Sequence, residues 1–267
     1  MTDPKPPLRE INPDRPLTDA AREEVAALAR RQSKAGGVLM QAINFVGGQV
    51  EDGLKLLPKS TRAQLDAAAR VALERSYHAA SQSRTGAGQS LSGGAAHRAM
   101  ATLSGAIGGL GGLPTALLEL PVATTLIFRA VQEVAEAHGE DPTSMETRIE
   151  CLRVFGAGGP GGLDDGVDTS FLGARISLTG AAVHGLIGKV APRFAAVLSQ
   201  KLASQAVPVL GAAAGAGTNF AFIRYYTEVA HVHFGLRQLA RLHNEAEVTE
   251  AFHRELARLT TPVLRGK

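Results

Sequence analysis

The sequence of 267 residues contains no tryptophan, only three tyrosines and nine phenylalanines, and one cysteine, Cys151. A disulfide scaffold needs paired cysteines, and cysteine-based structural zinc sites need two or more, so the cysteine count excludes both classes. The hydrophobic fraction is nevertheless 45%, and 30 residues are glycine. A disordered chain combines low hydrophobicity with high net charge, so that class is excluded as well. The apolar surplus consists of small residues, mainly alanine, glycine and valine.

The formal net charge is only +3, but the charge is uneven along the chain. Residues 1–98 carry a net +4, residues 99–188 a net −6 and residues 189–267 a net +5. Nucleic-acid binding usually requires a concentrated basic face with aromatic side chains for stacking. The sequence shows neither feature, and we expect no nucleic-acid partner.

The N-terminal residues 1–16 hold five of the 13 prolines and are predicted to form a disordered tail. They lack the apolar run of a signal peptide, so we expect a cytoplasmic protein. After the tail, apolar residues recur at helical spacing, and no strand pattern is visible. The first helix is expected to be capped by Thr18 or Asp19 and to stop at the glycines 36–37. The sequence predicts an all-α fold: a single helical domain over residues 17–267 with long Gly/Ala-rich core helices.

Two segments, residues 99–118 and residues 202–223, contain no charged side chain. Each is long enough to span a bilayer, which takes about 20 apolar residues. Each is rich in glycine, and glycines four residues apart, such as Gly108 and Gly112, let helices approach closely in membranes and soluble cores alike. Alanine and glycine contribute little to membrane insertion. Hydropathy therefore favours a tightly packed helical core, with membrane insertion or docking as the alternative.

A short repeat follows each uncharged segment. Residues 129–138 (RAVQEVAEAH) and residues 224–233 (RYYTEVAHVH) coincide at five of ten positions. We interpret the pair as two long helices that pack against each other in the core. Each helix is expected to enter polar surroundings at its arginine, Arg129 or Arg224.

Residues 156–161 match GxGxxG, the glycine pattern of dinucleotide-binding folds. That fold requires a strand before the pattern and a helix N-terminus after it. Ile149, Leu152 and Phe155 instead keep helical spacing, so we interpret the glycines as the end of a helix. Cys151 lies in this apolar stripe, which indicates a buried, unreactive thiol. We expect no bound cofactor.

The best candidate for metal or acid–base chemistry lies in the repeat. Glu228 and His231 form Glu-x-x-His, which places both side chains on one helix face. Di-iron bundles use two such pairs with two further glutamates. Here Glu133 and Glu136 occupy the equivalent positions of the first repeat, and Glu119 is a further acid. These five residues form a candidate polar cluster.

A simpler interpretation of the same residues involves no chemistry. Arg129 and Glu133, like Arg224 and Glu228, are four residues apart and can form ion pairs on exposed helix turns. The sequence alone assigns no metal ligand and no catalytic residue.

Longer stretches of the chain resemble the EcsC family. They comprise residues 118–129 (LELPVATTLIFR), 132–135 (QEVA), Gly139–Pro142, Glu146, residues 205–211 (QAVPVLG), Asn219, Phe222, His233–Phe234 and residues 237–239 (RQL). The stretch from Phe155 to Gly159, with Asp164 and Asp165, resembles a further part of the family. The likeness covers roughly residues 35–260, and Phe171 departs from it where a tyrosine is expected.

The resemblance implies a bacterial, largely helical protein without agreed catalytic residues. The family is named after a gene beside the genes of an ATP-driven exporter, which implies work at the cytoplasmic membrane face, on the lipid surface or with a membrane-transporter partner. The alternative hypothesis is a metal-carboxylate or hydrolytic enzyme that uses Glu119, Glu133, Glu136, Glu228 and His231. A third hypothesis is an adaptor whose acidic middle block binds a basic partner. Substrate, lipid preference and oligomeric state do not follow from the sequence.

Overall fold

The computed structural model describes residues 15–35, 37, 59–83, 99–100, 112–156, 185–191, 194–195 and 211–260. These residues are almost entirely helical and include no strand, which confirms the predicted all-α fold. The longer helices are α1 (Asp19–Ala35), α3 (Lys59–Ser83), α5 (Gly112–Ala137), α6 (Met145–Gly156), α8 (Gly211–Leu242) and α9 (Glu245–Thr260).

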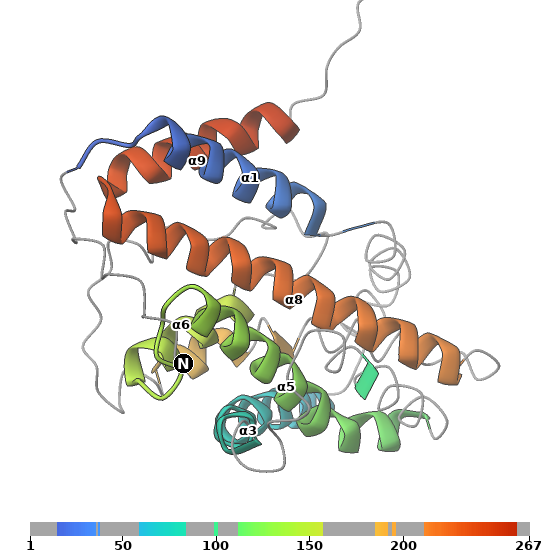
Figure 1. The fold of residues 1–267 in the computed structure, drawn as a ribbon. Coiled ribbons are helices and arrows are strands. Elements are labelled where there is room, and N and C mark those ends of the chain that lie inside the picture. Colours follow the sequence, from blue (N-terminus) through green and yellow to red (C-terminus); the bar gives the residue numbers. More distant parts are fainter. Residues whose placement is uncertain are drawn as a thin grey trace, which may run out of the picture.

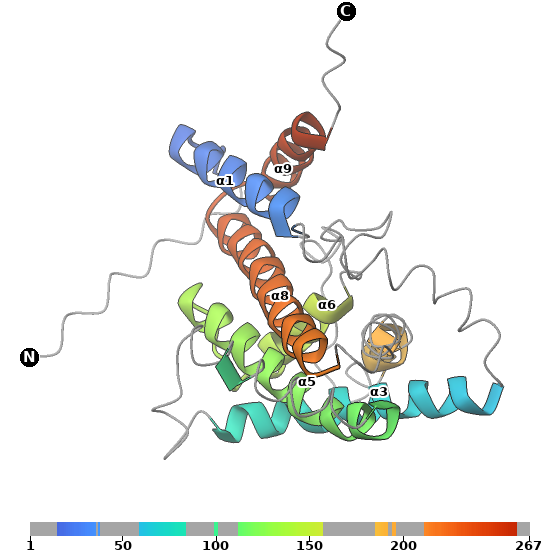
Figure 2. The ribbon, with the colours of Figure 1, turned by 90° about the vertical axis from the view of Figure 1, so that its right-hand side faces the viewer.

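The helices are stacked in the order α1 with α9, then α8, then α5 with α6, then α3 (Figure 1). The view turned by 90° shows the same order, with α3 at the end opposite α1 and α9 (Figure 2). Helix α8 has 32 residues and packs on α1, α5, α6 and α9, whereas α3 packs mainly on α5. The contact between α5 and α8 confirms the predicted pairing of the two long helices.

Helix α1 begins and ends where the sequence predicts. The Thr18 hydroxyl accepts a hydrogen bond from the Ala21 N–H at 3.3 Å, so Thr18 rather than Asp19 is the capping residue. The Leu17 N–H donates to the Glu247 carboxylate of α9 at 2.8 Å. The beginning of α1 is therefore fastened to α9, a helix more than 200 residues later in the chain.

Four aromatic residues of the described ranges pack together in the core. The ring centroid of Phe155 lies 4.2 Å from that of Phe128, 4.9 Å from that of Tyr226 and 5.2 Å from that of Phe194. All four side chains are at most 1% exposed. Each such aromatic pair contributes about 0.5–1.5 kcal/mol beyond the burial of its area. Cys151 on the same helix as Phe155 is fully buried, as predicted.

A glycine of α8 lies directly against a leucine side chain of α1. A Cβ atom added to Gly235 would lie 2.9 Å from Cδ2 of Leu28, which is closer than carbon atoms approach in folded proteins. From the sequence we expected the close approach of two helices to occur in the uncharged segments instead. Gly108 lies outside the described residues, and an added Cβ at Gly217 would have no neighbour within 4 Å.

The uncharged segments are described only in part, since α5 begins at residue 112 and α8 at residue 211. None of the helices in the described ranges is long and apolar enough to cross a membrane. One expectation for these helices is wrong: Arg129 is only 4% exposed, whereas Arg224 is exposed as expected. Helix α5, which carries Arg129, packs on both α3 and α8, so little of its surface is exposed.

The carbonyl of a proline inside α5 forms a hydrogen bond with α3. Pro121 has no N–H to donate within the helix, and prolines at such positions disturb the helical hydrogen bonding. Its carbonyl accepts hydrogen bonds from the Thr125 hydroxyl at 2.7 Å and from the Ser76 hydroxyl of α3 at 3.1 Å. The disturbed turn of α5 is therefore one of the points at which α3 is held.

Candidate functional site

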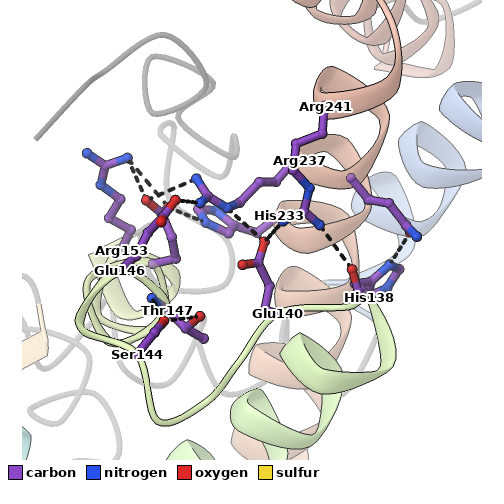
Figure 3. Close-up of polar contacts among 11 residues, drawn as sticks. His138, Glu140, Ser144, Glu146, Thr147, Arg153, His233, Arg237 and Arg241 are labelled. Carbon is purple, nitrogen blue, oxygen red and sulfur yellow. Dashed lines mark hydrogen bonds and ion pairs between the residues drawn. The ribbon is translucent and has the colours of Figure 1, made fainter. Parts of the chain in front are cut away.

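Two local motifs build the turn between α5 and α6 (Figure 3). At the end of α5, Gly139 has a φ of 80° and the Glu140 N–H donates to the Ala135 carbonyl at 3.0 Å, which is a Schellman motif. At the start of α6, the Ser144 hydroxyl accepts from the Thr147 N–H at 3.0 Å and caps the helix. Together the two motifs bring three glutamates, at positions 140, 146 and 150, within reach of α8.

Glu150 of α6 is the centre of a buried ion-pair cluster. Its carboxylate lies 2.8 Å from Nε2 of His233 and 3.3 Å from Nη1 of Arg153. Nη1 of Arg237 lies 3.5 Å from the same carboxylate. The side chains of Glu150 and His233 are only 5% and 3% exposed. These contacts join α6 to α8 at a point largely removed from water.

The outer part of the ion-pair cluster joins the α5–α6 turn to α8 (Figure 3). Glu140 accepts from Nε of Arg237 at 2.8 Å and from Nη1 of Arg241 at 2.7 Å. Arg237 also pairs with Glu146, whose side chain is half exposed at the rim. Nη2 of Arg241 donates to the carbonyl of His138 at 3.1 Å. One arginine of α8 thus contacts all three glutamates.

The charges of the ion-pair cluster balance, since three carboxylates face three guanidinium groups. Burial lowers the pKa of His233, so at neutral pH the imidazole is uncharged and Nε2–H donates to Glu150. Burial opposes ionisation of Glu150, but His233, Arg153 and Arg237 outweigh it and hold the pKa of the carboxyl below its usual value. Burial likewise opposes the charge of Arg237, yet Glu150 and Glu140 raise its pKa.

The ion-pair cluster is suited to holding helices together rather than to proton transfer. Guanidinium groups help to hold the pKa of Glu150 below its usual value, and a carboxylate stabilised in this way is a weak base. Breaking a buried ion pair by removing one partner costs about 3–5 kcal/mol, because the other partner stays buried without its counter-charge. The cluster therefore fixes α6 and the preceding turn against α8.

A second polar cluster lies where α1, the end of α5 and α8 meet. Nε2 of His138 lies 3.3 Å from Nδ1 of His231, and Nδ1 of His138 lies 3.1 Å from Oε1 of Gln238. Arg31 of α1 pairs with Glu228 at 2.5 Å. Burial, with Arg31 and His138 nearby, lowers the pKa of His231 to about 4, so this imidazole is neutral at physiological pH. These five residues are termed the histidine cluster.

The structure brings together two of the five residues that the sequence proposed as a polar cluster. Glu228 and His231 both lie close to Arg31 on the side of α8 that faces α1. Glu133 is half-buried and Glu136 exposed on α5, while the side chain of Glu119 lies outside what is described. Within the described ranges, no group of three or more His, Cys, Asp or Glu side chains is arranged to hold a metal ion.

The simpler expectation, ion pairs between exposed residues four positions apart, needs correction. Glu228 pairs with Arg31 of α1, because α1 packs over this part of α8. On α5, Arg129 is buried rather than exposed. Sequence spacing identified possible partners within one helix but not the helix that covers them.

Sequence reasoning missed the ion-pair cluster, although a signal for it is present. His233, Arg237 and Arg241 recur every four residues and so lie on one face of α8. Glu146 and Glu150 have the same spacing on α6. Two helices with charged stripes of opposite sign at four-residue spacing predict such an interface. His231 and His233 lie on different faces of α8, as their spacing of two residues predicts. His231 contacts His138 at the end of α5, and His233 contacts Glu150 of α6.

Residues 31–161 match the model of the EcsC protein family. This range contains α3, α5, α6 and the three glutamates of the ion-pair cluster, whereas their partners on α8 lie beyond it. The resemblance seen in residues 205–239 is outside the match and stays a prediction. Searches of curated proteins and of solved structures find no similar protein. The match assigns residues 31–161, which include α3, α5 and α6, to the EcsC family.

Proposed function

We propose that this protein binds the cytoplasmic face of a bacterial membrane through α3, by contact with anionic lipid headgroups. The observation that carries the proposal is the outward side of α3, where exposed arginines flank an exposed valine. The uncharged segment 99–118, which precedes most of α5 in the sequence, supports the same proposal.

The outward side of α3 combines positive charge with apolar surface. Arg70, Arg75 and His78 are exposed, and Val71 is 40% exposed. Residues 71, 75 and 78 lie on one face because they are four and three positions apart. On the neighbouring α5, Val122 is 52% exposed. Basic residues beside exposed apolar side chains are typical of helices that lie in a membrane interface.

The inward side of α3 is firmly held, so the helix can present its outward side without rearrangement. The Tyr77 hydroxyl donates to the Pro142 carbonyl at 2.8 Å, and the guanidinium of Arg148 lies 5.4 Å from the centre of the Tyr77 ring. Nε2 of Gln132 donates to the Ser81 hydroxyl at 2.9 Å. Helix α3 also lies at one end of the stack of helices, away from α1 and α9 (Figure 2).

The expected strength follows from the charges. A basic side chain near an anionic membrane surface contributes about 1 kcal/mol, so the loss of Arg70 or Arg75 weakens binding about fivefold. Salt screens such attraction over about 8 Å at physiological ionic strength, so binding through this surface weakens as salt is added.

The test is flotation of the purified full chain with vesicles of phosphatidylcholine alone or with about 30% phosphatidylglycerol. We expect binding to the anionic vesicles only. The double variant Arg70→Glu/Arg75→Glu should abolish it, and Val71→Asp should weaken it. The matched control is Arg254→Glu/Arg258→Glu, which makes the same charge change at two exposed positions of α9, at the other end of the molecule.

Equal flotation of both double variants would locate binding elsewhere and overturn the role of α3. No flotation of the wild-type chain with either vesicle would overturn lipid binding itself. If the chain then sediments only with native bacterial membranes, and protease treatment of those membranes removes the binding, a membrane-protein partner replaces the lipid surface.

A further inference from the structure

The two imidazoles of the histidine cluster are placed at a distance that suits a shared metal ion. Nε2 of His138 and Nδ1 of His231 are 3.3 Å apart, and their ring planes make an angle of 75°. Two nitrogen ligands at about 2.0–2.1 Å from a tetrahedral zinc ion are roughly 3.3–3.4 Å from each other. An ion can replace the hydrogen bond between the rings if the proton on Nδ1 of His231 moves to Nε2 of the same ring and both side chains rotate.

A neighbouring amide orients one of these ligands. Nδ1 of His138 lies 3.1 Å from Oε1 of Gln238, a carbonyl oxygen that accepts the Nδ1–H. In the neutral imidazole this leaves the lone pair on Nε2, the nitrogen that faces His231. A carbonyl or carboxylate that accepts the other N–H is the usual companion of a metal-binding histidine, because it fixes the tautomer and the ring orientation.

The carboxylate of Glu228 lies on the same face of α8 as His231 and becomes a third ligand only after it leaves its ion pair with Arg31. Glu228 precedes His231 by three positions on α8, and its carboxylate contacts Arg31 at 2.5 Å. The side chain of Arg31 is 39% exposed and can turn toward solvent when Glu228 rotates toward an ion. Since the described residues hold no preassembled set of three such ligands, water completes the coordination.

His138 and His231 are both half-buried, so part of each side chain is open to solvent. Gln238 also lines a cleft of about 600 Å³ between the start of α1 and the end of α8. The other polar side chains of this cleft belong to Arg15, Thr18, Glu24 and His243. An ion can therefore reach the histidines without unfolding of the helices.

We propose that His138 and His231, with Glu228, bind a divalent transition-metal ion of the Zn²⁺ class at the junction of α1, α5 and α8. Imidazole ligands with one carboxylate favour Zn²⁺, Ni²⁺ or Cu²⁺ over Mg²⁺ and Ca²⁺, which take oxygen ligands. Because Glu228 also contacts α1, ion binding would alter how α1 is held. This proposal does not depend on membrane binding.

The test is titration of the chelator-treated full chain with ZnCl₂ at neutral pH by calorimetry, with MgCl₂ as the comparison. We expect saturable binding of about one Zn²⁺ per chain and none of Mg²⁺. His138→Gln and His231→Gln should abolish it, and Gln238→Leu, which leaves all ligands in place, should weaken it about 10–100-fold. The matched control His78→Gln removes an exposed histidine of α3 and should bind like the wild type.

Zinc binding unchanged in His138→Gln and His231→Gln would overturn the proposal, as would binding lost equally in the His78→Gln control. Because a histidine variant could misfold, Co²⁺ provides a second measurement on the wild-type chain. Visible absorption bands of Co²⁺ bound through nitrogen ligands are expected, and they should disappear when excess Zn²⁺ is added. Absence of such bands in the folded wild-type chain would also overturn the proposal.

Discussion

Replacing Glu150 by glutamine removes one negative charge from the centre of the ion-pair cluster while keeping the size of the side chain. The carboxylate is held by His233, Arg153 and Arg237, and its side chain is 5% exposed. In the Glu150→Gln variant an amide replaces the carboxylate. The guanidinium groups of Arg153 and Arg237 then lose their common counter-charge in a place where water cannot fully replace it.

The expected loss of stability follows from burial. Removing one partner of a buried ion pair costs about 3–5 kcal/mol, and the remaining contacts of Arg237 with Glu140 and Glu146 place Glu150→Gln near the lower value. A loss of about 3 kcal/mol lowers the melting temperature of a chain of this size by roughly 6–12 °C.

The chain offers a matched control on α9. Glu255 and Arg258 have the same spacing of three residues as Glu150 and Arg153, but their side chains are 31% and 73% exposed instead of 5% and 13%. Exposed pairs contribute about 0–1 kcal/mol, so Glu255→Gln should change stability little. Urea unfolding of both variants at pH 7, followed by circular dichroism, measures the difference.

The outcome that would refute the reasoning is a similar free energy of unfolding for both variants. If Glu150→Gln loses less than about 1 kcal/mol, the cluster behaves as a solvent-exposed pair. If the slope of the free energy against urea also changes, the variant has altered the folded or unfolded ensemble, and the comparison of midpoints no longer measures the ion pair.

Three further predictions each concern a single residue. Gly235→Ala should destabilise the fold by about 1–3 kcal/mol in urea unfolding, because its Cβ would press on Leu28. The control Gly217→Ala has open space around the added Cβ and should not destabilise the fold. Equal losses in the two variants would contradict the role of Gly235. The pKa of Glu150 lies below 4.5 in the folded chain, so its contribution is complete above about pH 4.5 and lost as the pH falls through the folded value. The urea midpoint should therefore fall more steeply on acidification in the wild type than in Glu150→Gln, and parallel curves would disprove this. Cys151 is fully buried, so a thiol reagent should label it far more slowly in native buffer than in urea; rapid native labelling would show that α6 opens readily.

Local rules predicted much of the helical architecture. The hydroxyl of Thr18 caps α1, α1 ends at Ala35 and α6 at Gly156, close to the predicted glycine stops, and Cys151 is buried on an apolar stripe. Each of these features depends on residues within a few positions of one another, where backbone geometry and side-chain periodicity decide the outcome. The pairing of α5 and α8 was also predictable, because the two repeats mark helices of matching character.

The candidate site was not predictable in the same way, because its contacts join distant parts of the chain. Arg31 and Glu228 are 197 positions apart, and Glu150 and His233 are 83 apart. Spacing within a helix indicates which residues share a face but not which helix will cover that face. The same limit explains Arg129, which looked exposed in its own helix and is buried by its neighbours.

The central position of α8 has a consequence for how the molecule opens. Helix α8 packs on four other helices, so its core amide hydrogens can exchange with solvent only when most of the fold is lost. Helix α3 packs mainly on α5 and contacts α1, α8 and α9 little within the described residues, so the protection of its amide hydrogens depends on one packing surface. Hydrogen exchange should therefore divide the chain into a slowly exchanging unit around α8 and a faster unit formed by α3. The proposed lipid-binding surface belongs to the faster unit, and because the inward side of α3 stays packed on α5, a bound membrane should slow the exchange of α3 without changing that of α8.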